Sequence, residues 1–128
     1  MKRIVCIITM FLLVFSLASC SGGSYSAIGM VKSNFGNKAS LDFVSFKGHY
    51  TFVLRGEDGD DTVEYTANLE EGEMSLYYEE GDEWVHIVTL KSGESVSSTV
   101  KITPTKSVRV KLETNGKCKV GMVDLALN

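Results

Sequence analysis

Residues 62–79 read TVEYTANLEEGEMSLYYE, and this stretch decides the fold. Apolar side chains occupy every second position on both sides of the segment Glu70-Glu71-Gly72. They are Val63, Tyr65, Ala67 and Leu69 before it and Met74, Leu76 and Tyr78 after it. Successive side chains of a β-strand point to opposite faces of a sheet, so a period of two indicates a strand with one buried face. We therefore expect two strands, near 62–69 and 73–79, joined by a tight turn.

The same period recurs outward from this stretch in both directions. Further strands are expected near 29–35, 40–46, 49–55, 84–90, 95–103, 107–114 and 117–126. Turn signals separate them roughly every 8–12 residues, which is typical of an antiparallel sandwich or barrel. The predicted fold is all-β, an antiparallel β-sandwich of the jelly-roll or immunoglobulin-like kind with about eight strands.

The last two predicted strands allow their register to be tested. A two-residue loop, Asn115-Gly116, would place Leu112 opposite Lys119 and so mix apolar and charged side chains on one face. A three-residue loop of Thr114, Asn115 and Gly116 is compatible with a type I turn and a bulge. It pairs Leu112 with Cys118, Val110 with Val120 and Val108 with Met122. We expect the second register, which buries Cys118.

Aromatic side chains near one acidic turn are the candidate ligand contacts. Tyr77, Tyr78 and Trp84 flank the turn Glu80-Gly81-Asp82, and if Tyr78 faces the core then Tyr77 faces outward. Aromatic rings on an exposed sheet can stack on sugar rings or anchor a protein interface. We therefore predict that Tyr77 and Trp84 contact a protein or glycan ligand, with burial of Trp84 in the core as the alternative. The strand near 84–90 is apolar on both faces, which is typical of a central strand.

Acidic residues are concentrated in the middle of the chain, where 12 of the 16 lie between Glu57 and Glu83. Carboxylates are suitable ligands for Ca²⁺, and one predicted turn holds four of them, Glu57, Asp58, Asp60 and Asp61. Their spacing departs from that of an EF-hand loop, so a solvated turn is the alternative to a weak cation site. No other metal and no cofactor is expected. The net charge of −3 and the lack of clustered Lys and Arg argue against a nucleic-acid partner.

An enzymatic function has little support in the sequence. The segment Gly93-Glu94-Ser95-Val96-Ser97 departs from the G-x-S-x-G motif at its last residue and precedes a strand rather than a helix. A small hydrolase or a thiol-dependent enzyme is the alternative function. It would require Ser95 or Cys118 within hydrogen-bond reach of His49 or His86. We expect no catalytic residues.

The N-terminus has the features of an export signal. Met1-Lys2-Arg3 is followed by an apolar run over residues 4–17. This run is shorter than the ~20 residues that a transmembrane helix needs, and it matches a helical secretory signal peptide. The next residues, Leu17-Ala18-Ser19-Cys20, resemble the lipobox of bacterial lipoproteins. The resemblance implies that residues 1–19 are removed and that Cys20 carries a diacylglycerol thioether and an acylated amine, with chains such as palmitate.

The sequence therefore predicts three parts: the signal peptide 1–19, the lipidated Cys20 with a flexible tether to residue 28, and a β-sandwich domain over 29–128. The tether begins with the Gly/Ser segment 21–24, which is typical of flexible coil. The domain resembles small jelly-roll and immunoglobulin-like domains in architecture only. The predicted protein is a lipoprotein of the cell membrane or outer membrane with its domain outside the cytoplasm. Its predicted role is that of a binding or envelope-structural module whose ligand the sequence does not identify.

Overall fold

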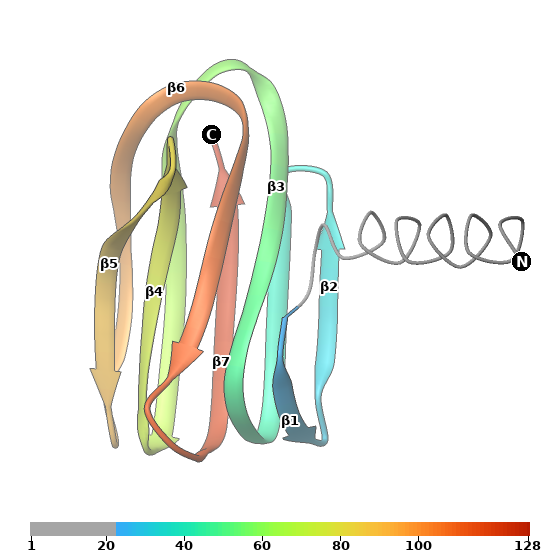
Figure 1. Ribbon diagram of the computed structural model, residues 1–128, viewed down its shortest axis with the longest axis vertical. Helices are drawn as coiled ribbons and strands as arrows, with labels where there is room; N and C mark the ends of the chain where they lie inside the picture. The colour runs from blue at the N-terminus through green and yellow to red at the C-terminus, as the bar shows by residue number, and fades with distance from the viewer. Residues whose placement is uncertain (1–22) are drawn as a thin grey trace, which may run out of the picture.

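The computed structural model describes residues 23–128 (Figure 1), so the predicted signal peptide and Cys20 lie outside the described residues. The strands are β1 (Tyr25–Ile28), β2 (Val31–Phe35), β3 (Lys38–Glu71), β4 (Glu73–Glu80), β5 (Glu83–Lys91), β6 (Ser95–Thr114) and β7 (Cys118–Leu127). Every strand pairing is antiparallel. Residues 23–128 contain no helix with the length and hydropathy needed to cross a membrane.

Two long strands build both layers of the fold, because each of them bends from one layer into the other (Figure 1). The first sheet contains β2, the start of β3, β7, residues 62–69 of β3 and residues 95–101 of β6. The second sheet contains residues 49–55 of β3, residues 107–113 of β6, β4 and β5. The predicted antiparallel β-sandwich is confirmed. The predicted separate strands 40–46, 49–55 and 62–69 are parts of β3, and 95–103 and 107–114 are parts of β6.

The core lies between the two sheets and follows the predicted alternation. All seven apolar side chains of the 62–79 stretch are buried, and so are Tyr50, Phe52 and Leu54 of β3. Phe52 is completely buried and packs edge-to-face on Tyr50, with 4.9 Å between ring centroids. The strand phase predicted for these segments is therefore confirmed.

The predicted C-terminal hairpin is wrong. Residues 107–113 pair with β3 and β4 in the second sheet, whereas β7 pairs with β3 in the first, so the loop after Thr114 joins the two layers. Cys118 lies opposite Phe46 instead of Leu112, although it is buried as expected. At Val120 the backbone φ is +49°, the side chain is exposed, and the phase of β7 shifts so that Val123 and Leu125 face the core. Hairpin geometry does not apply to a connection between layers.

Two further expectations differ from the structure. The 84–90 strand is not central, because β5 stands at the end of the strand order and pairs with β4. Residues 25–28, assigned above to the tether, form β1 and pair with residues 45–48 of β3. The reason is local packing: the Tyr25 ring stacks on Phe46 at 5.4 Å and meets Tyr50 edge-on at 5.6 Å.

Candidate functional site

The two aromatic residues predicted as ligand contacts lie together on the outer face of the second sheet. Tyr77 of β4 is paired with His86 of β5, and their rings meet edge-on at 5.5 Å. Trp84 is paired with Glu79 one step further along the same face. Both rings are partly exposed, so neither is a core residue. The structure thus places Tyr77 and Trp84 on one surface.

Cations from β6 occupy the faces of these rings. The Lys111 ammonium lies 4.6 Å from the centre of the Trp84 ring and 5.2 Å from that of Tyr77, and the Arg109 guanidinium lies 5.6 Å from Trp84. The charges are paired in turn, Arg109 with Glu79 at 2.9 Å and Lys111 with Glu113 at 3.3 Å. Cation–π contacts of this kind stabilise the face. They leave less ring surface free for stacking on a sugar.

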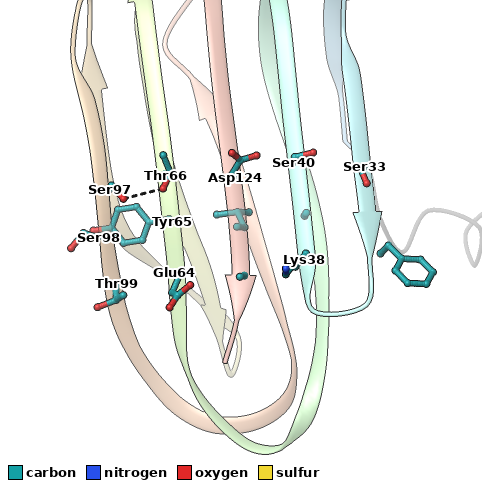
Figure 2. A pocket seen from close by; sticks show the side chains of 14 residues that line it. Ser33, Lys38, Ser40, Glu64, Tyr65, Thr66, Ser97, Ser98, Thr99 and Asp124 are labelled. Atoms are coloured by element: carbon teal, nitrogen blue, oxygen red, sulfur yellow. Dashed lines mark hydrogen bonds between the residues drawn. The ribbon is translucent and has the colours of Figure 1, made fainter.

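The outer face of the first sheet carries a groove of about 850 Å³ (Figure 2). Strand register aligns its side chains in two rows that each cross five strand segments, two of them from β3, because paired residues of antiparallel strands face the same side. Adjacent strands lie about 4.8 Å apart, so each row is about 19 Å long. One row is Ser33, Ser40, Asp124, Thr66 and Ser97. The next is Phe35, Lys38, Ala126, Glu64 and Thr99.

Ten of the 14 residues that line the groove carry a hydroxyl or a charged group. The Thr66 and Ser97 hydroxyls are 3.1 Å apart and hydrogen bonded, as Figure 2 shows. Within residues 23–128, the carboxylates of Glu64 and Asp124 form no hydrogen bond or ion pair with a protein side chain or backbone group. Phe35 stands at one end of its row with 87% of its surface exposed. The groove can therefore offer hydrogen-bond donors and acceptors together with one free aromatic ring.

Sequence reasoning missed this site. Ser40, Thr66 and Asp124 occupy the polar positions of alternating strands, which resemble any solvated sheet face. Their alignment depends on which strands are neighbours, and strand order is absent from the alternation itself. Phe35, the last residue of the predicted strand 29–35 and the neighbour of Gly36, is the one signal that could have directed attention to this edge.

The acidic turn predicted as a weak cation site is a bend within β3. Asp60 accepts a hydrogen bond from the Glu57 backbone N–H at 2.8 Å, and Asp61 pairs with Lys101 at 3.2 Å. The Thr62 hydroxyl and, secondarily, Lys101 lower the pKa of Asp61. In the part of the chain that the structure describes, no three His, Cys, Asp or Glu side chains are grouped so that they could hold a metal ion. The four carboxylates Glu57, Asp58, Asp60 and Asp61 thus do not converge on a common centre.

Two of the groups considered for catalysis, Cys118 and His86, form hydrogen bonds with other partners. The Cys118 thiol is buried and donates a hydrogen bond to the Glu73 carbonyl at 3.2 Å. The His86 ring bonds to the Thr89 hydroxyl at 2.7 Å. Among residues 23–128, no hydrogen bond joins Ser95 or Cys118 to His49 or His86. Burial raises the pKa of the Cys118 thiol, so at neutral pH it stays protonated and is a poor nucleophile.

We expect the folded protein to protect Cys118 from thiol reagents. In a Cys6→Ser/Cys20→Ser variant, an aromatic disulfide should react with the unfolded chain in guanidinium and leave the native protein unmodified over the same time. Absorbance of the released thiolate measures both reactions. A native rate equal to the unfolded rate would show that the thiol is accessible.

Comparison with solved structures places the fold among β-sandwich domains. It is similar to TmCBM61, solved in complex with β-1,4-galactotriose, with 13% identity over 86% of this chain and 88% of that chain and a TM-score of 0.52. Two others are a CBM4 structure (10% identity, 86% and 81% coverage, TM-score 0.43) and a mutant of a carbohydrate binding module of family 29 (14%, 83% and 78%, TM-score 0.42). At these identities the likeness concerns the fold alone. No family model and no curated protein matches the sequence.

Proposed function

We propose that this domain is a non-catalytic glycan-binding module, held outside the cytoplasm by lipid on Cys20, that receives its ligand in the groove of the first sheet. The proposal of a lipid anchor is based on the Leu17-Ala18-Ser19-Cys20 segment and the apolar run before it. The proposal of a glycan ligand is based on the groove. The described structure provides no nucleophile–histidine pair that would favour the hydrolase alternative.

The observation that carries the proposal is the pair of rows, with mainly polar side chains, across five strand segments of the first sheet. A polyhydroxylated ligand needs many donors and acceptors in fixed positions, and these rows supply hydroxyls, carboxylates and the Lys38 ammonium on a rigid sheet. Phe35 adds an apolar ring face, on which the C–H side of a sugar ring can stack. Glu64 and Asp124 against one lysine make the groove acidic, so a neutral glycan fits better than a polyanionic one. The sandwich shared with TmCBM61, which binds β-1,4-galactotriose, is consistent with this role.

The test is calorimetric titration of the protein with neutral oligosaccharides, with β-1,4-galactotriose among the probes. Asp124→Ala should weaken binding about 10- to 150-fold, the range for losing hydrogen bonds to a charged group. Tyr77→Ala is the matched control on the other sheet and should bind as the wild type does. The proposal is wrong if no neutral oligosaccharide binds, or if Asp124→Ala binds as tightly as the wild type.

A protein partner on the second sheet is the alternative, favoured by one observation. Tyr77, Trp84 and Arg109 share a face, and Tyr, Trp and Arg are the residues enriched where interfaces concentrate their binding energy. In that case the wild-type domain would capture the partner, Trp84→Ala would abolish this capture, and oligosaccharide titrations of the variant would be unchanged.

A further inference from the structure

Four aliphatic side chains stand exposed at one end of the first sheet. Ile28 is 65% exposed, Val31 68%, Val44 56% and Val120 43%. Single exposed apolar residues are normal on a protein surface, but contiguous ones mark an interaction surface. The question is therefore whether these four are neighbours.

Strand register places the four residues at neighbouring positions. Phe43 pairs with Gly121 and Ser45 with Lys119, so Val44 and Val120 lie opposite each other between these pairs. Ile28 pairs with Ser45, the residue after Val44, and a Cβ atom on the next residue, Gly29, would lie 2.7 Å from a Val44 methyl group. Val31 pairs with Asp42, which lies two residues before Val44 in β3 and faces the same side of the sheet. We call Ile28, Val31, Val44 and Val120 the aliphatic patch.

The patch lies close to the site predicted for lipid attachment. Only seven residues lie between Cys20 and Ile28, so the two are at most about 29 Å apart along the chain. β1 runs directly into the patch and fixes the end of the tether to β3 through residues 45–48. The patch also lies at the end of the sandwich near β1, away from the arch of β6 (Figure 1).

We propose that the aliphatic patch rests on the surface of the lipid bilayer that holds the Cys20 anchor. The inference depends on the lipidation of Cys20 in the proposed function and is independent of the groove's ligand. The anchor keeps the patch permanently near the membrane, so even a small gain from burying four aliphatic side chains is enough to orient the domain. The groove lies further along the same face, so its glycan would be bound close to the membrane surface.

The experiment uses the mature protein, purified from cells with its lipid on Cys20, in vesicles of phosphatidylethanolamine and phosphatidylglycerol. An environment-sensitive NBD fluorophore is attached at Val44→Cys or, as the matched control at the β6 arch, at Lys106→Cys. Thioether linkage blocks Cys20 and burial protects Cys118, so labelling is confined to the new cysteine. We expect a blue shift and stronger emission at position 44 on transfer from detergent-free buffer to vesicles, with no shift at position 106.

Each other outcome overturns the inference. Equal emission at positions 44 and 106 would show that the patch faces water. A blue shift at position 44 that needs no vesicles, with self-quenching between labels, would show that a second copy of the chain covers it. Failure to associate with vesicles would remove the anchor and the contact together. Oligosaccharide titration in solution remains unaffected by all three results, so the groove is tested separately.

Discussion

Replacing Phe52 with alanine is expected to lower the free energy of unfolding by about 3–5 kcal/mol, the usual cost of truncating a buried aromatic side chain. Phe52 is completely buried, packs on Tyr50, and lies opposite Val110 where β3 and β6 pair in the second sheet. Removing its ring leaves a cavity between the layers that neighbouring strands, held on both sides, can fill only in part. Because small domains have about 5–15 kcal/mol of stability in total, the loss should be visible as an early urea midpoint.

The measurement is urea unfolding followed by the fluorescence of Trp84, the single tryptophan of the chain. Phe35→Ala removes the same ring from an exposed position and should change the stability by no more than about 0.5 kcal/mol. Similar losses in the two variants would contradict the core described here.

Strand phase was predictable wherever burial alone decides it. On each side of the turn at Glu70-Glu71-Gly72, the apolar positions of residues 62–79 alternate without interruption, and all of them are buried. Connections between strands were less predictable, because a loop that joins the two layers and a loop that closes a hairpin have the same turn residues. The segment Thr114-Asn115-Gly116 shows this, since its left-handed Gly116 suits a hairpin although the loop joins the layers.

The candidate contacts illustrate a second limit. Alternation placed Tyr77 outward, and the structure shows it beside Trp84 on one face. That Lys111 lies over both rings depends on β6 being the neighbour of β4, which no local pattern states. Prediction of the groove also requires the strand order, because Ser40, Asp124 and Thr66 come from distant segments that only the strand order brings into one row.

Replacing Gly72 with alanine is expected to cost about 2–6 kcal/mol, because two penalties of about 1–3 kcal/mol each, backbone strain and overpacking, act at once. Gly72 joins β3 to β4 with φ at +113°, a backbone conformation that side chains disfavour. Its added Cβ would also lie 2.7 Å from the Cys118 sulfur and 2.9 Å from the Cys118 Cα.

Gly81→Ala separates the two penalties for Gly72. Gly81 also has a positive φ, +61°, but its added Cβ would meet nothing within 4 Å, so only the backbone cost of about 1–2 kcal/mol applies. The difference between the two urea midpoints therefore measures how rigidly β7 holds Cys118 against the β3–β4 turn. Because the sulfur contact is one of the two clashes, Cys118→Ala in the Gly72→Ala background should recover part of the loss. Equal losses at Gly72 and Gly81 would show that β7 shifts to accommodate the new methyl group. The packing around Cys118 would then be less rigid than its complete burial indicates.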